Sequence, residues 1–293
     1  MKRFIITGMA LLGSLAAMGS TSASASPAVA RNAIYSYGAG TLQTVTVYSP
    51  KVANGASVIL IHGGGFRSSA GDAIHLAIEA NTLVAYGDSV FVVNYRNDKG
   101  GVGIADQVAD VVSGSDWVLA NAASFGANPS ALTMIGGSSG GLIAADAAEL
   151  LNTASNGTVK TVITLSGPMD FGSIFSYWLP QSSPLAQLHR TNLSTVLGCT
   201  LTSHKHVRTY TCPTALEDQY SPDQQITSAN CPNSWIIFNG LSEEQPTSQA
   251  TAMDDALAAA GCTHSLNLFA DSAHAFDYWS VVKGQIQAAI AVA

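Results

Sequence analysis

The 293-residue sequence predicts an α/β fold built on a mostly parallel, doubly wound sheet of about eight strands. Short apolar runs alternate with longer amphipathic segments, the order expected when strands and helices alternate along a chain. Residues 58–61 and 90–93 are apolar at every position, which is typical of strands that helices cover on both faces. In such folds the ligand binds at the carboxyl ends of the strands.

The individual elements follow from the same pattern. Strands are expected at residues 41–48, 58–61, 90–95, 132–135, 159–166, 235–239 and 266–270, and helices at 72–86, 104–123, 140–151, 248–260 and 277–292. Residues 172–230 break the alternation, because they are long and rich in Ser, Thr, Pro and Gln. Since so long a connection is rarely a bare loop, we expect an insertion over the ligand site.

The first 30 residues have the pattern of a cleavable export signal. Lys2 and Arg3 precede a short apolar core at residues 4–18, and small residues allow cleavage after Ala25 or Ala30. The core is too short to span a bilayer, so no stable membrane insertion is expected. We therefore expect a secreted or periplasmic protein whose residues 31–293 form one domain.

The charge balance argues against some partners. The formal net charge is −7, and only 11% of the residues are charged. Nucleic acids and anionic membrane surfaces need clustered Lys and Arg, so neither is an expected partner.

Four cysteines follow the predicted signal, and an even number in an exported protein favours two disulfides. Cys231 and Cys262 each precede a predicted strand, and in neighbouring parallel strands they would meet at one sheet edge. That pairing leaves Cys199 with Cys212. The alternative is a zinc site, although its spacing matches no standard ligand pattern; it would use Cys199, His204, His206 and Cys212.

Chemistry-bearing residues follow the predicted strands. The strand at 132–135 leads into Gly136-Gly137-Ser138-Ser139-Gly140-Gly141, and a helix follows. A serine at such a strand-to-helix turn is exposed above the sheet, although the motif Gly-x-Ser-x-Gly fits here in two registers.

Three further groups complete the pattern. His62-Gly63-Gly64-Gly65 follows the strand at 58–61, where free N–H groups would face an oxyanion. Glu243 follows the strand at 235–239, and His274 follows the last strand. A nucleophilic serine needs a neutral imidazole, which in turn needs a carboxylate to orient it.

These motifs resemble those of the α/β-hydrolase fold, within the esterase and lipase group that carries an HGGG oxyanion motif. The chain looks like the hormone-sensitive-lipase-like esterases and the small secreted carboxylesterases. The resemblance implies Ser138 as nucleophile, because two glycines occupy the second and third positions after it; Ser139 is the alternative. It also implies an oxyanion hole formed by the N–H groups of Gly64, Gly65 and Ser139.

The resemblance implies a Ser-His-Glu triad with Glu243 as the acid, because Glu243 stands three residues after Gly240. Asp170 and Glu244 remain alternatives. The expected substrate is a small-molecule or polymer-borne ester, hydrolysed through an acyl-enzyme without metal or organic cofactor. An exported serine peptidase or amidase, or a non-catalytic binding protein on the same scaffold, is the competing interpretation. Residues 177–179 of the insertion would line the pocket or form the insertion's own core.

Overall fold

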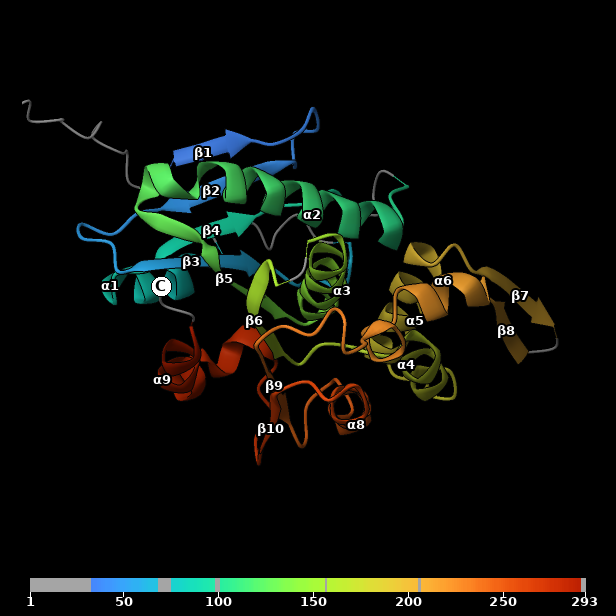
Figure 1. Cartoon of the computed structure of the whole chain (residues 1–293). Helices are drawn as coiled ribbons and strands as arrows, with labels where there is room; N and C mark the ends of the chain where they lie inside the picture. The colour runs from blue at the N-terminus through green and yellow to red at the C-terminus, as the bar shows by residue number, and fades with distance from the viewer. Residues whose placement is uncertain (1–32, 68–74, 98–100, 156, 205–206, 291–293) are drawn as a thin grey trace, which may run out of the picture.

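The computed structural model describes residues 33–67, 75–97, 101–155, 157–204 and 207–290 (Figure 1). The described residues form an eight-stranded sheet in the order β1-β2-β4-β3-β5-β6-β9-β10. The strands are β1 (Ala33–Ser36), β2 (Thr44–Tyr48), β3 (Gly55–Ile61), β4 (Ser89–Val93), β5 (Ala127–Gly137), β6 (Val159–Leu165), β9 (Ser234–Gly240) and β10 (His264–Phe269).

The sheet is mixed but mostly parallel. β1 pairs with β2 and β2 with β4 in antiparallel register, whereas all strand pairs from β4 to β10 are parallel. β4 lies between β2 and β3, so the strand order reverses at this point. From β3 onward, the later strands β5, β6, β9 and β10 follow one another on the other side of β3. This is the α/β-hydrolase fold that the sequence predicts.

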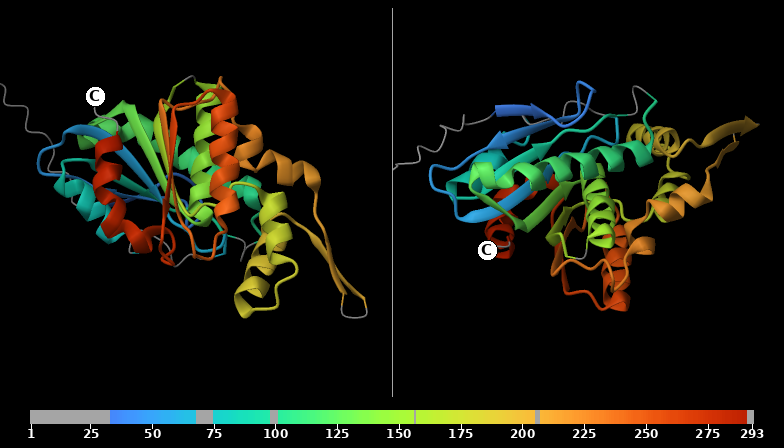
Figure 2. Two further views of the ribbon diagram at one scale, coloured as in Figure 1. Left: turned by 90° about the horizontal axis from the view of Figure 1, so that it is seen from below. Right: turned by 45° about the horizontal axis from the view of Figure 1, so that its top comes forward.

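Helices cover both faces of the sheet (Figures 1 and 2). α1 (Ala77–Ala85) and α9 (Trp279–Ala289) pack on one face with the buried side chains of β3 and β4. α2 (Ile104–Asn121) and α3 (Ser139–Ala154) pack on the other with β5 and β6, and α8 (Thr247–Ala260) joins the same core. Burial on both faces explains why the central strands are apolar at nearly every position.

Some element boundaries differ from the prediction. The helix expected at 72–86 begins at Ala77, and residues 72–74 lie outside the described part. The helix expected at 277–292 is divided, because the 3-10 helix η3 (Ala275–Tyr278) precedes α9. β1 has no counterpart in the prediction, because its four residues alternate only between half-buried and exposed positions.

The segment between β6 and β9 carries most of the predicted insertion, and it is not a bare loop. It contains α4 (Phe171–Trp178), α5 (Pro184–Val196), the hairpin β7 (Thr200–His204) and β8 (Val207–Thr211), α6 (Thr214–Gln219) and α7 (Pro222–Gln225). Figure 2 shows the hairpin projecting away from the sheet in both views.

Two disulfides hold the chain, and they are the pairs that the sequence predicts. Cys199–Cys212 closes the base of the β7–β8 hairpin, and Cys231–Cys262 joins the residues just before β9 and β10. Both cysteines of the alternative zinc site are therefore used in a disulfide.

The predicted export signal, residues 1–30, lies outside the described residues. Within the described part, no helix is both long and apolar enough to cross a membrane.

Candidate active site

Ser138 occupies a strained turn between β5 and α3. Its backbone has φ 54° and ψ −130°, a conformation that residues with a side chain rarely adopt. The turn is held at both sides, since Ser138 N–H donates to Leu165 O at 2.8 Å and Gly141 N–H donates to Ser138 O at 2.8 Å. The strain is stored where the sequence predicts a nucleophile.

Glycines around this turn are required because two backbone segments meet there. A Cβ on Gly63 would lie 2.8 Å from Gly137 O, and one on Gly140 would overlap the carbonyl group of His62. The turn at Ser138 and the loop after β3 therefore touch backbone to backbone, with no space for side chains between them.

The two adjacent serines have different surroundings. Ser138 is half-buried and lines the main pocket, whereas Ser139 is only 2% exposed and begins α3. Only Ser138 therefore presents its hydroxyl to that pocket.

The loop after β3 also borders the pocket. Gly64 and Gly65 have φ 119° and 62°, so this path favours glycine. Tyr95 supports the loop from below: its ring stacks on His62 at 4.5 Å, and its hydroxyl donates to His62 O at 2.8 Å. Among the described residues, none accepts a hydrogen bond from the N–H groups of Gly64, Gly65 or Ser139.

His274 and Glu243 form the closest polar pair of the site. Nδ1 of His274 donates to Glu243 Oε2 at 2.5 Å, and the Glu243 side chain is fully buried. Glu243 Oε1 also accepts from Gly240 N–H and from the Ser166 hydroxyl, both at 2.7 Å. The carboxylate is therefore fixed by three donors, and it fixes the orientation of the imidazole ring.

The sequence analysis predicted no role for Ser166, yet its hydroxyl bonds both to Glu243 and to the backbone next to His274. It lies directly after β6 with φ 53° and is completely buried. Its hydroxyl donates to Glu243, accepts from Ala275 N–H at 3.0 Å, and bonds the Tyr278 hydroxyl at 2.9 Å. Its place at a strand end was the only sequence signal that pointed to it.

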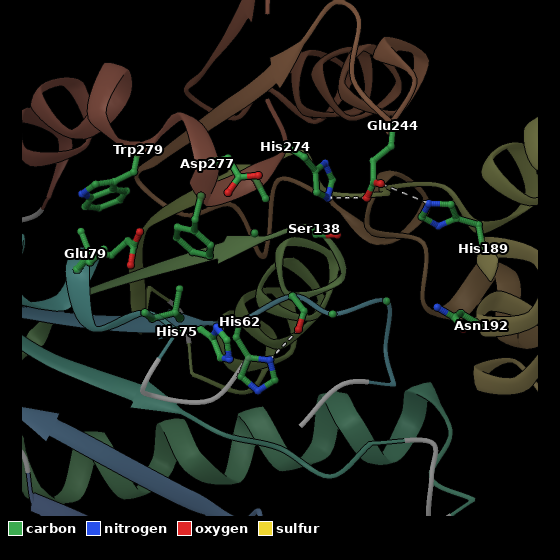
Figure 3. A pocket seen from close by; sticks show the side chains of 18 of the residues that line it. His62, His75, Glu79, Ser138, His189, Asn192, Glu244, His274, Asp277 and Trp279 are labelled. Atoms are coloured by element: carbon green, nitrogen blue, oxygen red, sulfur yellow. Dashed lines mark hydrogen bonds and ion pairs between the residues drawn. The ribbon is translucent and has the colours of Figure 1, made fainter. Parts of the chain in front are cut away.

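Glu244 contacts the other nitrogen of the imidazole, and this contact was not predicted either. Glu244 Oε1 lies 3.0 Å from His274 Nε2, and Glu244 Oε2 lies 3.8 Å from His189 Nε2 (Figure 3). His189 comes from α5 and stacks on Trp178 at 4.4 Å. His189 also lines the pocket, although no sequence motif pointed to it.

The two carboxylates change the charge of the imidazole. Burial of His274 disfavours its charged form, but the contacts with Glu243 and Glu244 outweigh it and raise the pKa of His274 to about 9. The contacts with His189 and His274 hold the pKa of Glu244 well below its usual range. In the resting protein the imidazole is therefore mostly protonated at neutral pH.

The remaining predicted residues lie away from the imidazole. Asp170 caps α4 by accepting from Ser173 N–H at 3.0 Å. Trp178 belongs to the core, while Tyr177 and Leu179 are 41% and 40% exposed, so residues 177–179 do not line the pocket. Of the three candidate acids, the structure brings Glu243 and Glu244 to His274.

Ser138 and His274 face a common pocket of about 820 Å³ (Figure 3). The loop after β3 forms one side of it. α5 contributes Leu185, Leu188, His189 and Asn192, and the opposite end is formed by residues 75–79 and 275–280. An α/β-hydrolase fold with a serine and a histidine at one pocket, and a buried carboxylate bonded to that histidine, is typical of the serine hydrolases.

Comparison with known proteins gives the family. Residues 45–230 match the BD-FAE family, more than half of the chain. The chain therefore belongs to the BD-FAE family, a family of carboxylic ester hydrolases.

A curated relative is phenmedipham hydrolase of Pseudarthrobacter oxydans, which is 31% identical over 105 residues. The match covers 33% of this chain and 21% of the relative, so the chain spans about a fifth of that protein.

Solved esterases share the fold. Esterase B from Lactobacillus rhamnosis has a TM-score of 0.64 at 19% identity, with 80% of this chain and 73% of that chain covered. Esterase 2 of Thermogutta terrifontis, solved with butyrate bound, has a TM-score of 0.63 at 20% identity, with 87% and 92% covered.

Proposed function

We propose that this protein is an exported serine carboxylesterase in which Ser138, His274 and Glu243 form the catalytic triad. The observation that carries the proposal is the 2.5 Å hydrogen bond between His274 and the buried Glu243, at a pocket that Ser138 also lines. Export is supported by the leader pattern of residues 1–30 and by the two disulfides, which persist in oxidising compartments.

The reaction uses groups of this chain alone. Nε2 of His274 removes the proton from the Ser138 hydroxyl while Oγ attacks the ester carbonyl. The N–H groups of Gly64, Gly65 and Ser139 stabilise the oxyanion, and Glu243 stabilises the imidazolium. His274 then protonates the leaving alcohol, and water hydrolyses the acyl-enzyme by the same route.

Two adjacent alanine variants test this proposal with p-nitrophenyl butyrate. Ser138→Ala removes the nucleophile, so turnover falls by about 10⁴-fold or more. Ser139→Ala retains the backbone N–H and keeps turnover within about tenfold of the wild type. A fluorophosphonate probe should label Ser138, as mapped by peptide mass. Labelling of Ser139, or full activity of Ser138→Ala, contradicts the assignment.

A further inference from the structure

One end of the pocket carries two carboxylates that the proposed reaction does not use. Glu79 on α1 lines the pocket and is 6% exposed, and its Oε2 has no hydrogen-bond partner among the described residues. Asp277 on η3 lies at the exposed rim of the same end. Figure 3 shows both on one side of Ser138, opposite Glu244 and His189.

The described lining residues include neither Lys nor Arg. The imidazolium of His274, which also lines the pocket, is already paired with Glu243 and Glu244. Burial, and then the negative charge of Asp277, raise the pKa of Glu79 above its usual value. A buried carboxylate without a counter-charge is costly in its ionised form, so a cation placed beside it would be stabilised.

Two aromatic side chains line the same end of the pocket as the carboxylates. Phe276 is half-buried and Trp279 is 4% exposed, and their ring centroids are 6.2 Å apart. Aromatic faces next to a carboxylate favour a quaternary ammonium group, because the ring quadrupole and the charge attract it together.

The chain path places this end beside the leaving group. Asp277 follows His274 by three residues, and its N–H donates to His274 O at 3.0 Å. Because His274 protonates the departing alcohol in the proposed reaction, the alcohol part of the ester lies near this turn. We propose that Glu79 and Asp277, with Phe276 and Trp279, form a subsite for a cationic group on the alcohol part of the substrate. The inference rests on the proposed esterase function.

A pair of esters of the same shape tests the subsite. Butyrylcholine carries a quaternary ammonium group, and 3,3-dimethylbutyl butyrate has a neutral carbon in its place. We expect kcat/KM to favour the cationic ester by at least about tenfold, equivalent to about 1.4 kcal/mol. Glu79→Gln and Asp277→Asn should each reduce this ratio by about threefold or more. Glu217→Gln, on α6 outside the pocket, should leave the ratio unchanged.

The outcomes separate the subsite from the proposed function. Hydrolysis of p-nitrophenyl butyrate with a cationic-to-neutral ratio near one overturns the subsite alone. A preference for glyceryl monobutyrate over both esters overturns it in favour of hydroxyl recognition.

If Glu79→Gln does not fold, the surface variant Asp277→Asn decides. If no ester is hydrolysed, the esterase proposal fails, and calorimetric titration with tetramethylammonium decides the subsite: binding to the wild type that Asp277→Asn weakens supports it, and no binding overturns it.

Discussion

Glu244 Oε1 lies 3.0 Å from His274 Nε2, the nitrogen that a serine nucleophile needs as its base. Glu243 holds the opposite nitrogen at 2.5 Å, so the imidazole lies between two carboxylates. This arrangement stabilises the imidazolium, which cannot accept a proton from Ser138. The second carboxylate therefore opposes the proposed reaction at neutral pH.

Glu244→Gln should increase activity at pH 7. With the pKa of His274 at about 9, kcat/KM rises with pH and reaches half its maximum near pH 9. Removing one adjacent negative charge destabilises the imidazolium, so the midpoint moves down by about 1–3 pH units. At pH 7 the neutral fraction, and kcat/KM with it, should rise by about tenfold or more. A pH profile with an unmoved midpoint would show that Glu244 does not act on His274.

Glu243→Gln should lower kcat by about 10³–10⁴-fold, because the buried amide no longer stabilises the imidazolium. Asp170→Asn is the matched control, since Asp170 only caps α4. It should cost about 1 kcal/mol of stability at most and leave kcat within about threefold. Steady-state kinetics with p-nitrophenyl butyrate compares the two variants. Equal activity in both would remove Glu243 from the triad.

Ser166→Ala should lower kcat by about 10–100-fold with little change in KM, because its hydroxyl positions Glu243 and the backbone of Ala275. Unfolding should become easier by about 1–3 kcal/mol, since buried polar groups lose their partner. Ser166→Gly is the control: it relieves the positive φ but also lacks the hydroxyl. It should show the same loss of kcat, whereas recovery of kcat in the glycine variant would assign the defect to backbone strain.

Stability should fall as the pH rises, because α3 buries two carboxyl groups. Burial raises the pKa of Asp146 and Glu149 well above their usual values, and neither carboxylate oxygen of Asp146 has a partner among the described residues. Their folded pKa values exceed the unfolded ones, so folding takes up protons. The folded protein therefore keeps its full stability below the unfolded pKa of these two groups and loses stability as the pH rises through their folded pKa.

The measurement is the melting temperature at pH 5 and pH 8. The wild type should melt higher at pH 5, and Asp146→Asn should raise the pH 8 value by about 2–4 °C or more and reduce the difference. Asp255→Asn, an exposed change on α8, should leave the difference as it is. A wild type that melts at the same temperature at both pH values would contradict the burial argument.

The central strands of the sheet could be predicted because burial on both faces requires runs of apolar residues. Residues 58–61 of β3 and 90–93 of β4 are all apolar, since helices cover both faces of these strands. Cys231 and Cys262 could be paired from their places before two neighbouring strands. β1 and the β7–β8 hairpin carry no such pattern, because β1 is an edge strand and the hairpin forms a two-stranded sheet of its own.

The site is predictable only where a residue is tied to a strand end. Ser138, Glu243 and His274 each follow a strand of the parallel part of the sheet, so topology alone brings them to one edge. The contact between Glu244 and His189 depends on how α5 packs over the pocket, which no local pattern encodes. The hydrogen bonds of Ser166 likewise depend on three segments that are distant in the sequence and adjacent in the fold.

The backbone contact between the loop after β3 and the turn at Ser138 divides the pocket into a part that cannot change and a part that can. Gly63 and Gly140 leave no space for even a methyl group between these segments, so no substitution at either glycine can widen the loop after β3 without moving Ser138. New substrate preferences are therefore expected from substitutions on α5, in residues 75–79 and at the exposed Asp277, which border the same pocket. For protein engineering, these pocket-lining positions are the ones to randomise, and the glycines at the backbone contact are best left unchanged.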